Sequence, residues 1–155
     1  MDQKTEVIQV FARTPIVGEV KTRLIPLLGE AGSCELHKEM ILRLIKSLSS
    51  IRSDIEIWTD KDQEDPFLTN LAYPLIRQVG DDLGEKMGHA ITKGLARYDK
   101  VALIGTDLPE LDSVYLENAF KELDRYPVVI GPTSDGGFGL IALTKFKNRI
   151  FSGLR

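Results

Sequence analysis

VIQVFARTPIVGEVKTRL, residues 7–24, is the stretch that decides the fold. It begins with an apolar run, residues 7–12, which is typical of a strand buried on both faces of a sheet. A loop follows directly and carries three cations, Arg13, Lys21 and Arg23. Ligands of open α/β sheets bind at the carboxyl ends of the strands, so these cations are expected where a di- or triphosphate would bind. An ordinary solvated surface loop explains the stretch equally well when it is taken alone.

This loop matches neither of two well-known phosphate-binding loops. The segment 18–22 lacks the Gly-Lys pair of a P-loop, and no Gly-x-Gly-x-x-Gly fingerprint follows the first strand. Phosphate would therefore be held by side chains more than by backbone amides.

Size and composition favour a small protein of a reducing compartment. The chain has 155 residues, a formal net charge of −3 and a single cysteine, Cys34. This length suits one domain, residues 1–155, and a lone cysteine allows no intrachain disulfide. Acidic and basic residues are interspersed and no apolar run is long enough to span a membrane. We therefore expect a cytoplasmic protein with no nucleic-acid or membrane partner.

Strand-like and helix-like segments alternate along most of the chain. Apolar residues at helical spacing follow the candidate N-caps Ser33 and Asp112, and a third such set begins at Leu83. Strands are expected at 54–59, around 75–76 and at 101–105, with a buried strand at 128–131 and a strand at 138–143 returning beside it. The alternation predicts an α/β fold with a mainly parallel sheet sandwiched by helices.

Two aspartates, Asp107 and Asp135, each follow a strand-like run and precede a turn. The sheet would bring both to the edge that carries the loop with Arg13, Lys21 and Arg23, called the basic loop below. One or two carboxylates plus phosphate oxygens are the usual ligands of Mg2+. Gly136 and Gly137 would leave room for a nucleotide or its sugar and permit positive φ. A structural explanation competes: Asp107 caps a turn, and Asp135 with Gly136 forms another.

Neither histidine is expected to be a metal ligand or a catalytic base. His37 and His89 fall inside predicted helices without a second histidine or cysteine at ligand spacing. No serine lies in a Gly-x-Ser-x-Gly elbow, which argues against an α/β-type hydrolase.

Four ordered motifs carry a family resemblance: FARTPIVGEVKTRL at 11–24, DLGEKM at 82–87, IGTDLP at 104–109 and GPTSDGGF at 131–138. Together they resemble the bacterial DUF2064 family, which is grouped with nucleotide-diphospho-sugar transferases of the GT-A fold. They resemble the phospholactate guanylyltransferases more distantly. The resemblance implies a GT-A-type, glycosyltransferase-like domain, with nucleotidyl transfer as the alternative.

Carried over position by position, the resemblance implies three overlapping sets of residues. The catalytic set is Lys21, Asp107 and Asp135, and the two aspartates would also hold the metal, Mg2+ or Mn2+. A turn at Gly84 would lie near the base or the sugar. The nucleotide-binding positions are Ala12, Arg13, Thr14, Gly18, Lys21, Arg23, Gly84, Gly136 and Gly137.

The chain departs from the family pattern at several points. Gly105 stands two residues before Asp107, so a full Asp-x-Asp pair is absent. Lys86 replaces a frequent Arg and Phe138 a frequent Tyr. Relatives continue beyond residue 155 through a further strand and a terminal helix. We therefore expect a sheet without these elements, whose exposed apolar surface favours a homodimer.

The leading hypothesis is a metal-dependent transferase. It would bind a nucleotide or nucleotide-sugar on the basic loop and move a glycosyl or nucleotidyl group to a small-molecule acceptor, with fixed cations stabilising the departing phosphate. Two other hypotheses stay open: a non-catalytic nucleotide-binding module, and a structural or interaction protein that keeps only the fold.

Overall fold

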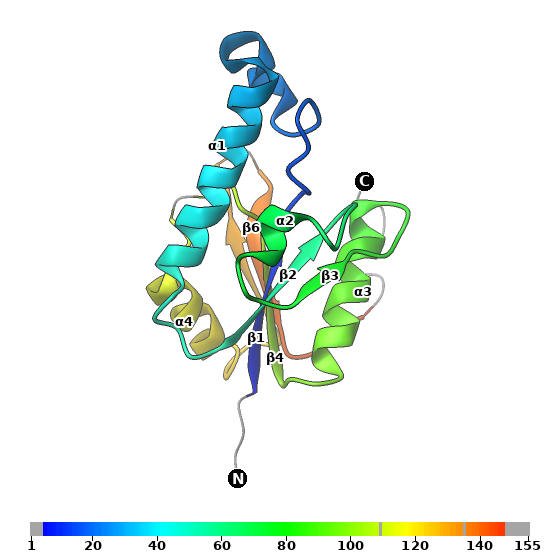
Figure 1. Ribbon diagram of the computed structural model, residues 1–155. Helices are drawn as coiled ribbons and strands as arrows, with labels where there is room; N and C mark the ends of the chain where they lie inside the picture. The colour runs from blue at the N-terminus through cyan, green and yellow to red at the C-terminus, as the bar shows by residue number, and fades with distance from the viewer. Residues whose placement is uncertain (1–4, 109, 135, 148–155) are drawn as a thin grey trace.

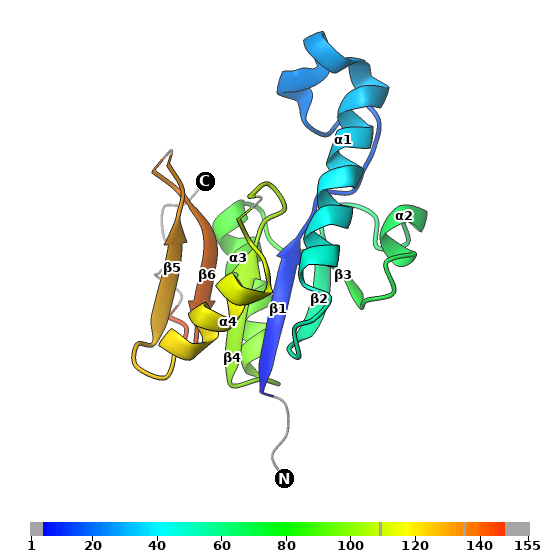
Figure 2. The same cartoon turned by 90° about the vertical axis from the view of Figure 1, so that its left-hand side faces the viewer.

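A six-stranded sheet with the order β3-β2-β1-β4-β6-β5 forms the centre of the computed structural model, which describes residues 5–108, 110–134 and 136–147. The strands β1 (Glu6–Phe11), β2 (Asp54–Thr59), β3 (Leu75–Arg77) and β4 (Lys100–Ile104) run parallel. Strand β6 (Phe138–Leu143) is antiparallel to β4, and β5 (Val128–Pro132) is antiparallel to β6. Figure 2 shows this order across the molecule. The predicted mainly parallel sheet is confirmed.

Helices cover both faces of the sheet, as the alternation predicted. On one face lie α1 (Ile25–Ser47), α4 (Ser113–Glu122) and the short α2 (Pro66–Thr69), whereas α3 (Leu83–Leu95) covers the other (Figure 1). Successive β1 side chains alternate between the two cores: Ile8 packs with α1 and α4, and Val7 packs with α3. Strands β1 and β4 are therefore buried on both faces and provide a rigid base for the loops at their carboxyl ends.

Helix α1 begins earlier than the sequence pattern predicts. It starts at Ile25, after the 3-10 turn η1 (Thr22–Leu24), and bends at Gly29, which has a φ of 78°. Ser33 is fully buried inside the helix, so the prediction that it is the N-cap was wrong. The first turns of α1 and the loop before them extend beyond the carboxyl end of β1, clear of the sheet (Figures 1 and 2).

Helices α3 and α4 begin at aspartate caps. The Asp82 carboxylate accepts a hydrogen bond from the Glu85 N–H at 2.8 Å. Asp112, the predicted cap of α4, accepts one from the Tyr115 N–H at 2.9 Å. Each cap satisfies a backbone donor that the helix leaves without a partner.

The strand at 128–131 was predicted to be buried, and that prediction was wrong. It is β6 that pairs with β4, so β5 lies at the margin of the described sheet and Ile130 is 52% exposed. Within the described part of the chain, no helix combines the length and the apolar character needed to cross a membrane.

Candidate functional site

Lys21 and Asp107 meet at the carboxyl ends of β1 and β4. Because these strands are parallel neighbours, with Val10 opposite Ile104, the loops that leave them begin side by side. The Lys21 ammonium donates to Asp107 Oδ1 at 2.9 Å, across 86 residues of sequence. The Lys21 side chain is 14% exposed and that of Asp107 is 70% exposed. The sequence predicted that these two loops converge, and they do.

A cavity of about 310 Å³ surrounds this pair and is called the cation-lined cavity below. All three predicted cations, Arg13, Lys21 and Arg23, line it together with Asp107, and its size falls within the range of small-molecule sites. The lining itself holds three cations and one carboxylate, so its formal charge is positive, which favours an anionic ligand. The remaining lining residues are Phe11, Val20, Thr22, His37, Gly105 and Thr106.

Lys21 occupies its position at the expense of backbone strain. Its φ of 49° and ψ of 46° lie in the left-handed region, which costs a residue with a side chain about 1–2 kcal/mol. The turn is held in place by Val20, which is 2% exposed, and by the Leu24 N–H, which donates to the Lys21 carbonyl at 2.9 Å. Backbone strain of this kind is concentrated at functional sites, so the conformation agrees with a role for the ammonium group.

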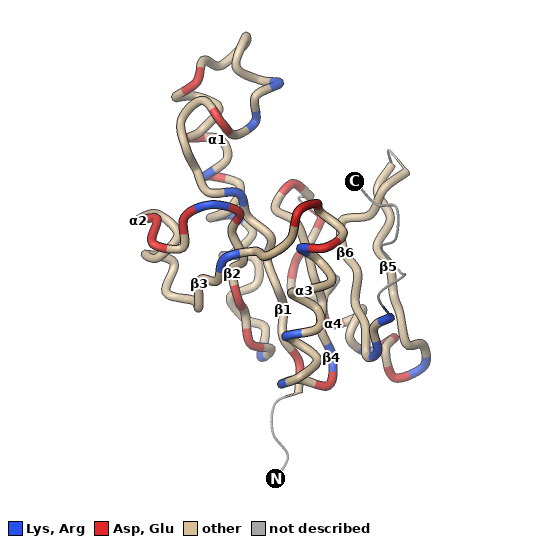
Figure 3. The backbone as a smooth tube through the Cα atoms, turned by 90° about the vertical axis from the view of Figure 1, so that its right-hand side faces the viewer, with Lys and Arg blue, Asp and Glu red and all other residues tan. Residues whose placement is uncertain are grey.

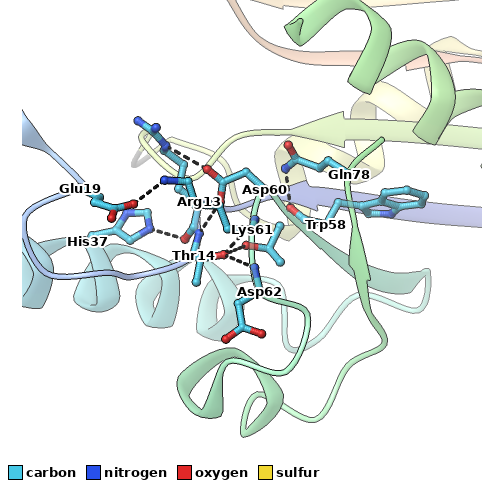
Figure 4. A network of polar contacts seen from close by, with 10 residues as sticks. Arg13, Thr14, Glu19, His37, Trp58, Asp60, Lys61, Asp62 and Gln78 are labelled. Atoms are coloured by element: carbon cyan, nitrogen blue, oxygen red, sulfur yellow. Dashed lines mark hydrogen bonds and ion pairs between the residues drawn. The ribbon is translucent and has the colours of Figure 1, made fainter. Parts of the chain in front are cut away.

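A polar network from the end of β2 supports the basic loop (Figure 4). The Thr14 N–H donates to Asp60 Oδ1 at 2.9 Å, and the Arg13 guanidinium lies 3.5 Å from Asp60 Oδ2. The Thr14 hydroxyl contacts the Thr59 hydroxyl at 2.8 Å and accepts from the Asp62 N–H at 3.0 Å. Burial alone would raise the pKa of Asp60, but the Thr14 hydrogen bonds and the Arg13 charge outweigh it and lower that pKa. Asp60 therefore remains ionised and holds the start of the loop.

A second contact closes the loop from the same side. Lys61, which follows Asp60, forms an ion pair with Glu19 of the loop (Figure 4). We did not predict Asp60 or Lys61 as part of the site. Asp60 follows β2 directly, and Asp107 follows β4 after two residues, so an acid just after a strand is the signal that could have identified Asp60.

His37 also lines the cation-lined cavity, in a structural role that the sequence did not predict. It is 4% exposed, and its Nε2 donates to the Arg13 carbonyl at 2.8 Å, since a carbonyl oxygen only accepts. Burial lowers the pKa of His37, as do the charges of Lys21 and Arg13, and this outweighs the opposing effects of the Arg13 carbonyl and Asp107. The imidazole is thus a neutral donor that fixes the backbone at Arg13. The signal in the sequence was a polar residue on the apolar stripe of a helix.

Three of the predicted nucleotide-binding residues in residues 12–24 lie outside the lining of the cation-lined cavity. Ala12 is buried at the end of β1, and Thr14 is buried in the network with Asp60. Gly18 has a φ of 88°, a conformation that favours glycine, and it does not line the cavity. Ala12, Thr14 and Gly18 therefore support the conformation of the loop without lining the cavity.

A second cavity, also of about 310 Å³, adjoins the first and is called the apolar cavity. Phe11 and Gly105 line both cavities. The predicted Gly137 lines the apolar cavity, whereas Gly136, with a φ of 92°, does not. Gly84 is buried within the first turn of α3, so the expected turn at Gly84 was wrong. The other residues of this lining are Leu83, Met87, Leu103, Phe138 and Gly139.

Asp135, predicted as a catalytic residue and metal ligand, lies outside the described residues. Across residues 5–108, 110–134 and 136–147, no group of three or more His, Cys, Asp or Glu side chains is arranged to hold a metal ion. Charged residues of both signs are interspersed along the described backbone, without a face reserved for one sign (Figure 3). The lining of the cation-lined cavity differs, with three cations and one carboxylate, although Asp60 pairs with Arg13 from outside it.

Comparison with known proteins agrees with this architecture. Residues 44–155 match the model of the family described as "Uncharacterized protein conserved in bacteria (DUF2064)". A crystal structure from Desulfovibrio desulfuricans G20, of a protein proposed to be a nucleotide-diphospho-sugar transferase, is 30% identical. It superposes with a TM-score of 0.89 over 99% of this chain and 70% of that one. No curated protein matches the sequence.

More distant solved structures share the fold. A cytidylyltransferase from Leptospira borgpetersenii serovar Hardjo-bovis is 12% identical, with a TM-score of 0.58 over 92% of this chain and 61% of that one. A CMP:2-keto-3-deoxy-manno-octonic acid synthetase in complex with CTP is 10% identical, with a TM-score of 0.60 over 98% and 79% of the two chains. At these identities the likeness establishes the fold alone.

Proposed function

Because the chain belongs to the DUF2064 family, we propose that it is a nucleotide-dependent transferase whose donor phosphates bind in the cation-lined cavity. The observation that carries this proposal is the contact between Lys21 and Asp107, flanked by Arg13 and Arg23, where β1 and β4 end. Cations from one loop and a carboxylate from another suit a donor that carries phosphate and a divalent metal.

Each of the two adjoining cavities suits one part of a nucleotide. The cation-lined cavity suits a diphosphate or triphosphate, and the apolar cavity suits the nucleoside. Phe11 and Phe138 offer aromatic surface, and Gly105, which has open space where a Cβ would lie, leaves room for a base or sugar. Since Phe11 and Gly105 line both cavities, one molecule can extend from one into the other.

The chemistry asked of the protein is mainly electrostatic. Lys21 is neutralised by Asp107 in the free protein, and a bound phosphate would compete for its ammonium group. Arg13 and Arg23 would face the same phosphates, with Arg13 held by Asp60 and through its carbonyl by His37. Fixed cations stabilise the negative charge that builds up on a departing phosphate because they need no rearrangement during the reaction.

Asp107 is suited to hold Mg2+ or Mn2+, because such ions take one or two carboxylates and complete their shell with phosphate oxygens and water. Its carboxylate is 70% exposed and so is open to a ligand, and the Thr106 hydroxyl adjoins it. When bound, the ion would neutralise charge on the phosphates. Asp135 remains the predicted second acid.

Two reactions use such a site, and the released product separates them. Glycosyl transfer from a sugar nucleotide releases a nucleoside diphosphate, whereas nucleotidyl transfer from a triphosphate releases pyrophosphate. The Desulfovibrio relative favours the first, and the fold shared with cytidylyltransferases keeps the second as a candidate. Incubation with sugar nucleotides and with nucleoside triphosphates, with and without Mg2+, and chromatography of the products would decide.

Asp107→Asn should abolish whichever activity is found, with Asp124→Asn as the matched control. Asp124 pairs with Lys100 at 2.8 Å, at the amino end of β4. The Lys100 side chain is 17% exposed and that of Asp124 is 67% exposed, close to the values for Lys21 and Asp107. Turnover that survives in Asp107→Asn would contradict the proposed site. Nucleotide binding without any turnover would identify a binding module instead.

A further inference from the structure

A third cavity, of about 440 Å³, lies between α1 and the loop that follows β4, and we call it the α1 groove. Its walls are mostly apolar: Leu36, Met40 and Leu44 from α1 face Leu108 and Leu111 from the loop. Its volume falls within the range of small-molecule sites. The function proposed above makes no use of it.

The groove is continuous with the site through the segment 105–108. Gly105 lines the apolar and the cation-lined cavity, Thr106 lines the cation-lined cavity and the α1 groove, and Leu108 lines the groove. Asp107 therefore stands between the donor phosphates and the groove. A molecule in the groove would have one end at Thr106, next to Asp107, where the transferred group would be.

The polar groups of the groove indicate which end of an occupant is apolar. The Ser47 hydroxyl bonds to the carbonyls of Leu44 and Leu111, at 2.8 and 3.2 Å, so it is already engaged. Arg43 pairs with Glu39 one turn earlier on α1 at 3.3 Å, and both side chains are more than half exposed. The charge at the rim is thus compensated, and the remaining polar group is Thr106, at the Asp107 end.

From this arrangement we infer that the α1 groove binds the acceptor, and that the acceptor is an alcohol with an uncharged, apolar body whose hydroxyl lies at Thr106 and Asp107. This inference rests on the proposed transferase function. In either transfer the acceptor oxygen forms the new bond to the sugar carbon or to phosphorus. The bond to the nucleoside diphosphate or pyrophosphate breaks, that group leaves with the electron pair, and the hydroxyl proton passes to water.

Two methionines provide a built-in comparison for the test. Met40 lines the α1 groove and Met87 lines the apolar cavity. We would label the methionine methyl groups with 13C, assign their signals with Met40→Leu and Met87→Leu, and titrate the full chain with 1-butanol, 1-hexanol and 1-octanol. The Met40 signal should shift in a saturable way while the Met87 signal stays in place. Each buried CH2 should tighten binding by up to about fourfold.

Blocking the groove provides the second arm. Met40→Trp fills the groove, and Leu42→Trp adds the same ring on an exposed position of α1, where the leucine is 44% exposed. Met40→Trp should lose transfer to 1-octanol and keep its affinity for nucleotide, and Leu42→Trp should keep both. The titration of the wild-type chain does not depend on whether either variant folds.

The outcomes separate this inference from the proposed function. An unmoved Met40 signal, a shift of Met87 alone, or affinity that does not depend on alcohol length would overturn the acceptor groove. If nucleotide still binds in calorimetry in that case, the donor site stands. If alcohols bind at Met40 but no nucleotide binds, the transferase proposal fails and with it the acceptor role.

Discussion

Lys21→Met tests the donor site by removing one charge and little else. Methionine keeps the length and apolar character of the lysine stem, which matters because that side chain is only 14% exposed. Loss of the ion pair should change the free energy of unfolding by less than about 1 kcal/mol, since Asp107 is 70% exposed and water replaces its partner. A folded variant with an altered site is therefore expected.

The effect on ligand affinity should be much larger. A hydrogen bond between an ammonium group and a phosphate contributes about 1.5–3 kcal/mol, so the Kd for a nucleoside di- or triphosphate should rise about 10- to 150-fold. Isothermal titration calorimetry measures this directly. Lys21→Arg, which keeps the charge, should lose less affinity.

Lys100→Met is the control for general loss of charge. Lys100 pairs with Asp124 at 2.8 Å, has a side-chain exposure of 17%, and lies at the opposite end of β4. Its replacement should leave the Kd for nucleotide unchanged. Equal affinities in the wild-type chain and Lys21→Met, or equal losses in Lys21→Met and Lys100→Met, would refute the reasoning.

Three further substitutions probe the support of the site and the fold. His37→Phe removes the donor to the Arg13 carbonyl and should lower the free energy of unfolding by about 1 kcal/mol, which His37→Gln should partly restore. Because burial lowers the pKa of His37, the stability of the wild-type chain should fall as the pH drops below about 6.5, and both variants should lack that part of the pH profile. Asp60→Asn should weaken the contact that holds Arg13. Since the pKa of Asp60 is lowered, the stability that its carboxylate contributes is present above about pH 4 and is lost as the pH falls through its folded pKa, so the acid denaturation curves of the wild-type chain and the variant should converge there. Gly94→Ala should lower the free energy of unfolding, measured in urea, by about 1–3 kcal/mol despite the better helix propensity of alanine, because the added Cβ would lie 2.7 Å from Val101 Cγ2. An unchanged free energy of unfolding would show that α3 moves away from β4 freely.

The sequence was sufficient for the sheet and for one central contact of the site. Continuous apolar runs identify β1 and β4 because both strands are buried on both faces. Their parallel pairing then brings Lys21 to Asp107, which follows from the rule that ligands bind at the carboxyl ends of strands. Local pattern and global topology agree at these positions.

The remaining features depend on contacts that a single sequence does not display. The start of α1 was misplaced because Gly29 bends the helix instead of ending it, which left Ser33 in its interior. His37 lies on an apolar stripe, and its role emerges only from the position of the Arg13 carbonyl. The exposure of β5 follows from β6 taking the place beside β4.

The central claim is that the cation-lined cavity binds the phosphates of a nucleotide. Its most direct test is the melting temperature of the wild-type chain with nucleosides, nucleoside di- and triphosphates and sugar nucleotides, each with and without Mg2+. At about 100 Kd a ligand stabilises by about 2.7 kcal/mol, or roughly 5–11 °C for a chain of 155 residues. We expect a shift of this size for at least one phosphorylated compound and none for its parent nucleoside. No shift with any of them, or equal shifts with the nucleoside alone, would contradict the claim.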